Sequence, residues 1–184
     1  MKENNIHIRP AAAADAPFVA KVVLMALHYD ESHPLYGIFR ELAARTDAQY
    51  SYCNALVAEV DGDVAGAIVG YDGARLYELR APLLSLVKER QGKELEIEDE
   101  TSAGEFYLDS LAVLPAFRGH GVGRALLVAA RDRAFAAGHE HVGLIVDFDN
   151  PRAEKLYASL GFVRMEATKF LGHDMWHMQV SCKQ

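Results

Sequence analysis

The chain of 184 residues has few cysteines, no long apolar run and no excess of basic residues, and each shortage excludes a class of protein. Cys53 and Cys182 lie far apart and form no CxxC pair, so we expect two ordinary reduced thiols and a cytoplasmic protein. No apolar stretch approaches the roughly 20 residues that cross a bilayer, so no membrane span or membrane partner is expected. The first ten residues lack the apolar core of a secretion signal. The net charge of −7 argues against nucleic-acid binding, which needs a basic face.

The residues that are present fit an ordinary globular domain. Apolar residues make up 51% of the chain and charged residues 24%, and the length suits a single domain with a sizeable core. The acidic charge is concentrated, because seven acidic and two basic residues lie between Glu89 and Glu105. Such a segment is either a solvated loop or a rim that attracts a cationic substrate.

Apolar spacing predicts a mixed α/β domain around one sheet, with no internal repeat and no low-complexity linker. Asp61-Gly62-Asp63 between two apolar runs predicts a hairpin. Asp15 and Asn150 are the expected N-caps of two helices. The predicted strands cover residues 6–9, 55–60, 64–71, 105–114, 141–148, 162–167 and 175–180. The predicted helices cover about 15–25, 35–44, 83–90, 121–137 and 150–161, and residues 72–104 are the least readable part.

The stretch FRGHGVGR places Gly119, Gly121 and Gly123 between a predicted strand and a predicted helix. A P-loop is excluded because Arg124-Ala125 follows Gly123 where Lys-Ser/Thr is required. A dinucleotide-binding G-x-G-x-x-G is excluded because its third glycine would fall on Arg124 or Leu126.

The remaining pattern is R-x-x-G-x-G on Arg118, Gly121 and Gly123. Free N–H groups and the dipole at a helix N-terminus bind anions, and glycines let a pyrophosphate approach the backbone. Arg118 and Arg124 can add charge-assisted hydrogen bonds. A flexible strand-to-helix loop is the alternative interpretation.

The segment LDSLAVLPAFRGHGVGRALL, followed by NPRAEKLYASLGF, resembles the GCN5-related N-acetyltransferase (GNAT) superfamily. The resemblance covers nearly the whole chain except residues 72–104. It implies a GNAT-type acyl-CoA N-acyltransferase fold, a central mixed sheet flanked by helices, in one domain spanning residues 1–184 with a less typical acidic insert at about 72–104. It also implies acetyl-CoA as the cofactor. The cofactor-binding residues that it implies are Leu111, Ala112, Val113, Arg118, Gly119, His120, Gly121, Val122, Gly123, Arg124, Asn150 and Tyr157.

The resemblance further implies catalytic roles. A backbone N–H near Leu111 to Val113 would stabilise the oxyanion. Tyr157 would act as general acid toward the leaving thiolate, although its spacing also suits a core tyrosine. The general base stays open among Asp109, Glu105 and a water chain. Protein N-terminal acetyltransferases often carry a glutamate where this chain has Ile145.

The histidines suggest no metal site, because His139-x-His141 and His173-x₃-His177 lack a third ligand. His120, in the glycine turn, would help to solvate phosphate or point to water.

The sequence therefore predicts transfer of acetyl from acetyl-CoA to a primary amine, expected to be a small cationic molecule. A protein N-terminal or lysine acetyltransferase and a non-catalytic acyl-CoA-binding module are the alternatives. A homodimer stays open, since dimers are common in the family, and no motif names the acceptor.

Overall fold

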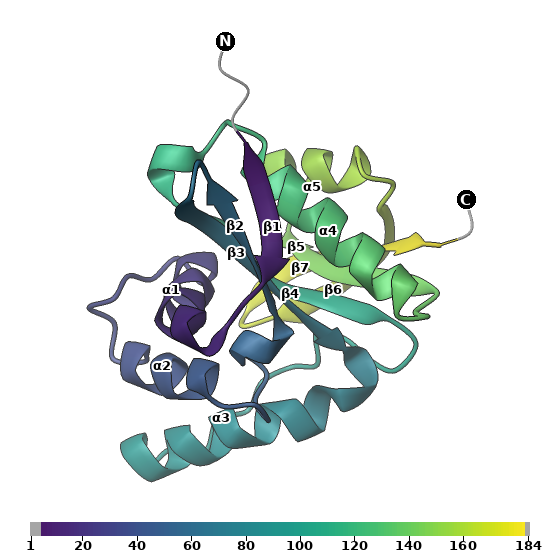
Figure 1. The fold of residues 1–184 in the computed structure, drawn as a ribbon. Coiled ribbons are helices and arrows are strands. Elements are labelled where there is room, and N and C mark those ends of the chain that lie inside the picture. Colours follow the sequence, from purple (N-terminus) through teal and green to yellow (C-terminus); the bar gives the residue numbers. More distant parts are fainter. Residues whose placement is uncertain (1–4, 183–184) are drawn as a thin grey trace.

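The computed structural model describes residues 5–182, which form a seven-stranded mixed sheet with helices on both faces (Figure 1). The strand order is β1-β2-β3-β4-β5-β7-β6, and each neighbouring pair is antiparallel except β4 and β5. The strands are β1 (Ile6–Pro10), β2 (Ala55–Val60), β3 (Asp63–Asp72), β4 (Phe106–Val113), β5 (His141–Asp147), β6 (Val163–Phe170) and β7 (His173–Ser181). The helices are α1 (Ala16–Ala26), α2 (Tyr36–Ala44), α3 (Leu76–Gln91), α4 (Val122–Ala136) and α5 (Pro151–Ala158). The predicted central mixed sheet flanked by helices is confirmed.

The helices form two layers. In Figure 1, α1, α2 and α3 lie together on one side of the sheet, while α4 and α5 lie on the other. The apolar face predicted for α4 is buried, since Leu126, Leu127, Ala130 and Ala134 are each at most 5% exposed. Each of the two leucines contributes roughly 1.5–3 kcal/mol of burial free energy.

The ends of the helices after β4 and β5 follow local sequence signals. Asn150 caps α5 as predicted, because its Oδ1 accepts the Ala153 N–H at 3.1 Å. Pro151 occupies the first helical position, where no N–H donor is needed. Gly138, just after α4, has a φ of +95°, which favours glycine.

Two helix predictions need correction. The helix predicted at residues 83–90 belongs to the longer α3, which begins at Leu76 and contains Pro82. Proline disfavours a helix interior, but buried Leu79 extends the apolar face before it. Asp15 precedes α1 as expected, yet its carboxylate makes no capping bond to that helix. Its Oδ2 accepts instead from Arg9 at 2.6 Å and from the backbone of Ala12 at 2.7 Å.

The last two strands are longer than predicted. β6 and β7 run beyond residues 162–167 and 175–180 toward a tight turn at Leu171 and Gly172. Both turn residues have positive φ, +50° and +81°, which matches a two-residue hairpin turn.

Candidate active site

The sheet opens between β4 and β5. These parallel strands pair only at Phe106–Val142 and Tyr107–Gly143, near the start of each strand. Further along, β4 stays paired with β3 and β5 stays paired with β7. The facing edges of β4 and β5 therefore diverge toward their C-terminal ends and leave a gap in the described sheet.

The backbone of β4 presents polar groups to this gap. Leu114 donates its N–H to the Ala65 carbonyl of β3 at 2.8 Å. Successive residues of a strand direct their backbone groups to opposite sides. The N–H and C=O groups of Val113 and Leu111 therefore point toward β5. The Val113 carbonyl accepts instead from Arg118 Nε at 3.0 Å. The gap thus has a hydrogen-bonding edge that β5 does not use.

A β-bulge lies at the point where the strands diverge. β3 and β4 pair through Val69–Ser110 and Gly70–Leu108, so Asp109 is the extra residue of β4. A bulge bends its strand and redirects side chains. Asp109 consequently turns toward the side of the sheet covered by α1–α3 rather than keeping a regular register.

The glycine turn joins β4 to α4 beside the gap. Gly119 and Gly121 have φ values of +80° and +84°, in the left-handed region that favours glycine. A Cβ added to Gly119 would meet nothing within 4 Å, so backbone conformation rather than crowding selects glycine there. Gly121 is the N-cap of α4, and no side chain of residues 5–182 caps this helix end. Such a helix end binds anions well.

Polar side chains surround the turn. Arg118 and His120 are exposed on it. Arg124, in the first turn of α4, donates from Nη1 to Ser159 Oγ at 2.9 Å, which links α4 to the end of α5. The two arginines thus lie at the N-terminal end of α4.

Other predicted cofactor contacts depend on backbone groups. The Val122 side chain packs into the core and is 1% exposed. Ala112 packs beside the α1 residue Val22, on the opposite side of β4 from Leu111 and Val113. The main chain of Val122 therefore stays available to a ligand at the turn, whereas the main chain of Ala112 faces β3 and not the gap.

Tyr157 lies on α5, which packs against β5. Its ring lies 6.1 Å from the Phe162 ring, centroid to centroid, in a tilted arrangement. Burial raises the pKa of Tyr157 to about 12, so the phenol keeps its proton at neutral pH. Asn150, at the start of the same helix, uses its side-chain oxygen for the cap.

Asp109 belongs to a cluster with a second carboxyl group, Glu100. Gln49 Nε2 lies 2.8 Å from Asp109 Oδ2 and 2.9 Å from Glu100 Oε1. The Tyr71 hydroxyl lies 3.1 Å from each of these two oxygens. Ser110 donates to the other Asp109 oxygen at 2.6 Å. Two carboxyl groups thus share the same two donors, which come from distant parts of the chain.

Burial raises the pKa of both carboxyl groups. Burial and the neighbouring Asp109 raise the pKa of Glu100 to about 7, although the Arg80 guanidinium opposes the shift. Burial likewise raises the pKa of Asp109, against hydrogen bonds from Ser110, Gln49 and Tyr71. The pair therefore exchanges a proton more easily near neutral pH than ordinary carboxyl groups do.

Glu105 forms a separate cluster on the same side of the sheet. Its carboxylate contacts His177 Nε2 at 2.9 Å, Gln179 Nε2 at 3.0 Å and Thr101 Oγ1 at 2.7 Å. Burial would raise the pKa of Glu105, but these hydrogen bonds outweigh it and hold that pKa below its ordinary value. The hydrogen bond with Glu105 raises the pKa of His177. A Cβ on Gly143 would lie 1.9 Å from Glu105 Oε2, so glycine is required beneath this carboxylate.

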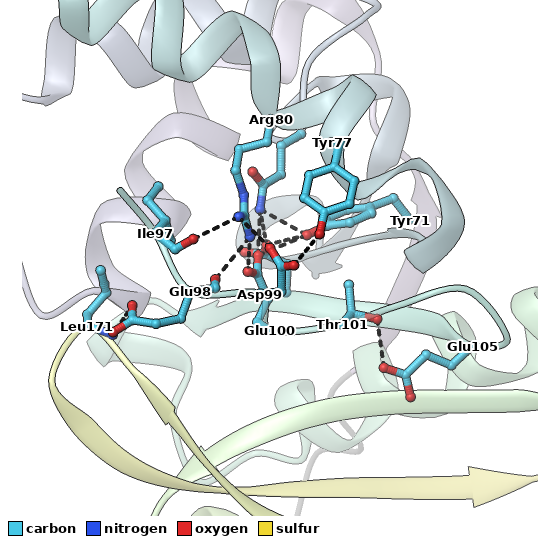
Figure 2. Close-up of polar contacts among 12 residues, drawn as sticks. Tyr71, Tyr77, Arg80, Ile97, Glu98, Asp99, Glu100, Thr101, Glu105 and Leu171 are labelled. Atoms are coloured by element: carbon cyan, nitrogen blue, oxygen red, sulfur yellow. Dashed lines mark hydrogen bonds and ion pairs between the residues drawn. The ribbon is translucent and has the colours of Figure 1, made fainter. Parts of the chain in front are cut away.

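The acidic segment between α3 and β4 is held by one buried arginine. Figure 2 shows Arg80 reaching from α3 toward this segment. Arg80 Nη1 donates to the Ile97 carbonyl at 3.1 Å and to Asp99 at 3.0 Å. Its Nη2 donates to the Glu98 carbonyl at 3.2 Å and to the Glu100 carboxylate. The segment has no regular secondary structure, yet its path is defined by these bonds.

A cavity of about 580 Å³ lies between this segment and β5–β7–β6. Its polar lining includes Tyr77, Asp99, Glu100, Glu105, Glu166 and His177. No lysine or arginine is among the described residues that line it. The cavity therefore suits a positively charged ligand.

Sequence reasoning missed Gln49, Tyr71, Arg80, Glu100 and His177. Glu100 stood inside a run of acidic residues, His177 was considered only as a metal ligand in His173-x₃-His177, and the other three had no motif around them. Of the two predicted base candidates, Asp109 lies in the carboxyl cluster and Glu105 lies in the cavity wall.

Within residues 5–182, no helix is long and apolar enough to span a membrane. The same residues contain no group of three or more His, Cys, Asp or Glu side chains suited to a metal ion. Cys53 and Cys182 are exposed and free.

The model of the acetyltransferase (GNAT) family matches residues 24–162. A crystal structure described as an acetyltransferase is 36% identical, with a TM-score of 0.81 over 96% of this chain and 100% of that chain. An N-acetyltransferase from Staphylococcus aureus Mu50 is 26% identical, with a TM-score of 0.80 over 95% of this chain and 100% of that chain.

A curated relative matches over a shorter stretch. The mycothiol acetyltransferase of Kineococcus radiotolerans is 52% identical over 65 residues, which are 35% of this chain and 20% of that protein. The match thus spans about a fifth of the relative's length.

Proposed function

The chain belongs to the acetyltransferase (GNAT) family, and we propose that it transfers the acetyl group of acetyl-CoA to the primary amine of a small cationic molecule. One observation carries the proposal: the gap between β4 and β5 ends at an uncapped helix N-terminus preceded by two glycines with positive φ. This arrangement offers backbone donors along the gap and an anion site at its end.

Acetyl-CoA is the cofactor of this family, and the residues present fit it. The first turn of α4, together with Arg118 and Arg124, would hold the pyrophosphate. The main-chain groups of Leu111 and Val113 would hydrogen-bond the pantetheine arm. The bound cofactor supplies an activated thioester.

We assign roles to the reacting groups as the family resemblance implies. An N–H of the Leu111 to Val113 backbone would stabilise the oxyanion, because donors aimed at developing charge are strong catalytic contributions. Tyr157, protonated at neutral pH, would give its proton to the departing sulfur. Asn150 supports this role by fixing the start of the helix that carries Tyr157.

The acidic cavity supports a cationic acceptor. Glu105 stays ionised at neutral pH because its pKa is held low, and Glu166 and Asp99 add negative charge to the lining. An ammonium group entering this cavity would meet several carboxyl groups and no lysine or arginine among the lining residues, with His177 already paired to Glu105. We therefore assign Glu105 to binding of the acceptor's positive charge.

The test is a panel of amines with detection of the free CoA thiol. Small diamines and amino sugars should react faster than neutral amines of the same size. Peptides with free N-termini or lysines form a second arm. Faster turnover of peptides would indicate a protein acceptor instead of a small molecule. Absence of turnover with every amine would indicate a non-catalytic acyl-CoA-binding module.

The cavity can be tested separately with Glu105→Gln. This change should raise KM for cationic amines and leave KM for acetyl-CoA unchanged. Glu96→Gln, an exposed residue of the same acidic segment, is the matched control. Equal KM values in both variants would contradict the assignment of the cavity.

A further inference from the structure

Two carboxyl groups meet beside the reaction gap. Glu100 comes from the acidic segment and Asp109 from the bulge of β4, and both contact Gln49 and Tyr71. We propose that Asp109 and Glu100 share one proton and act together as the proton acceptor for the amine. This inference rests on the proposed function, and it assigns a role to Glu100 and its partners.

The two carboxyl groups differ in access. The Glu100 side chain borders the cavity but is only 2% exposed, and Arg80, Gln49 and Tyr71 occupy its oxygens, so little of it is open to an amine. Asp109 is partly exposed and occupies the bulge where β4 separates from β5. Asp109 is therefore the catalytic residue of the pair, and Glu100 acts through it as a positioning residue.

Within the carboxyl pair, the positive charge of Arg80 is bonded to Glu100 alone. Arg80 contacts Glu100 Oε2 on the far side from Asp109 and makes no hydrogen bond to Asp109 among the described residues. Two carboxylates in contact with the same donors repel each other, so one of them retains a proton more readily. Glu100, paired with Arg80, is the group that ionises first, and Asp109 is left to take up and release the proton.

The remaining neighbours add no second cation. Gln49 is 2% exposed, and its backbone N–H donates to the Leu79 carbonyl at 2.8 Å, which fixes it beneath the pair. The charged and titratable groups around the pair are Tyr50 after α2, Tyr71 on β3, Arg80 on α3, Asp99 before β4, and Glu105 and Tyr107 at the start of β4. Burial raises the pKa of Tyr71 far above its ordinary range, so its hydroxyl stays a donor.

The proton balance follows directly. An alkylammonium acceptor must lose two protons to become an amide. The first passes from nitrogen to Asp109, which frees the lone pair, and the pair later releases this proton to water. The C–N bond then forms and the C–S bond breaks. The second proton leaves the nitrogen for water, and Tyr157 protonates the departing sulfur and is reprotonated from water.

The decisive measurement is the pH dependence of kcat/KM with a reactive amine. In the wild type, activity should rise with pH through an acid limb that lies above the pH range of ordinary carboxyl groups, because the pair must lose its proton before it can act. Glu100→Gln removes the repelling charge, so Asp109 ionises more easily and the limb should move to lower pH. Asp109→Asn should lower kcat/KM by about 100-fold or more. Glu96→Gln, exposed in the same segment, should leave the pH of the acid limb unchanged.

A second measurement works without turnover. Carbon-13 NMR of side-chain carboxyl groups should show the pair titrating above the pH range of ordinary carboxyl groups in the wild-type protein. In Glu100→Gln the Asp109 signal should titrate at lower pH. Ordinary titration of both groups would overturn the shared proton, whatever the activity. Coincident acid limbs in wild type and Glu100→Gln, with activity retained, would overturn the catalytic role alone. Absence of transfer to any amine would overturn the proposed function and this catalytic role together.

Discussion

Arg80→Met removes the guanidinium that holds the acidic segment while keeping an apolar side chain of similar length. Arg80 is 4% exposed and contacts the Asp99 and Glu100 carboxylates together with two backbone carbonyls. Removing one partner of a buried ion pair costs about 3–5 kcal/mol. Coulomb's law at an effective dielectric constant of about 20 gives about 4 kcal/mol for charges about 4 Å apart, which agrees. The free energy of unfolding of a whole domain is about 5–15 kcal/mol, so the variant should be markedly less stable.

The loss should also depend on pH. Arg80 lowers the pKa of Glu100, so this pKa is higher in the variant than in the wild type. A carboxyl group whose pKa is higher in the folded than in the unfolded protein lowers the free energy of unfolding as pH rises through the folded pKa. The deficit of the variant should therefore be larger at pH 8.5 than at pH 5.5, where Glu100 can be protonated.

Urea denaturation at both pH values measures this deficit. Arg75→Met is the matched control, because Arg75 lies just before α3, is exposed and pairs with exposed Glu78. Its effect should stay within about 1 kcal/mol, as for other surface ion pairs. An Arg80→Met protein whose free energy of unfolding is within about 1 kcal/mol of the wild type at both pH values, or is reduced more at pH 5.5, would contradict this role of Arg80.

Three further predictions concern the proposed cofactor site and the cavity. Arg118→Glu should abolish tight binding of acetyl-CoA in calorimetric titrations, because like charges would meet at the phosphates; unchanged affinity would remove the turn from the site. Tyr157→Phe should lower kcat more than it raises KM in steady-state assays, whereas an unaltered kcat would exclude Tyr157 as the acid. Gly143→Ala should displace the Glu105 carboxylate, since the new Cβ would lie 1.9 Å from its Oε2. In an NMR titration the pKa of His177 should then fall toward its ordinary value, and an unchanged pKa would show that Glu105 tolerates the methyl group.

The local features of the glycine turn and of α5 could be predicted from the sequence because single residues determine them. Gly119 and Gly121 adopt backbone conformations that favour glycine, and Asn150-Pro151 forms the start of α5 as expected. The spacing of apolar residues was sufficient to predict α4. Such signals act over a few residues, so they are readable without tertiary context.

The carboxyl pair could not be predicted because it depends on contacts between distant segments. Gln49 meets Glu100 and Asp109 across 51 and 60 positions of the chain, and no motif marks that approach. In the acidic segment, charge pattern alone does not separate exposed Glu96 from buried Glu100. Glu100 differs from Glu96 because it pairs with Arg80. Arg80 lies on α3, which contains Pro82 although proline disfavours a helix interior.

The gap between β4 and β5 divides the sheet into two parts that meet only at Phe106–Tyr107 and Val142–Gly143. Along β4, the Leu114 amide is bonded to β3, whereas the Val113 amide points into the gap. Hydrogen exchange should therefore alternate between slow and fast at adjacent residues of one strand. A pantetheine arm bound in the gap would act as a missing strand, and it would slow the fast amides and couple the two parts of the sheet.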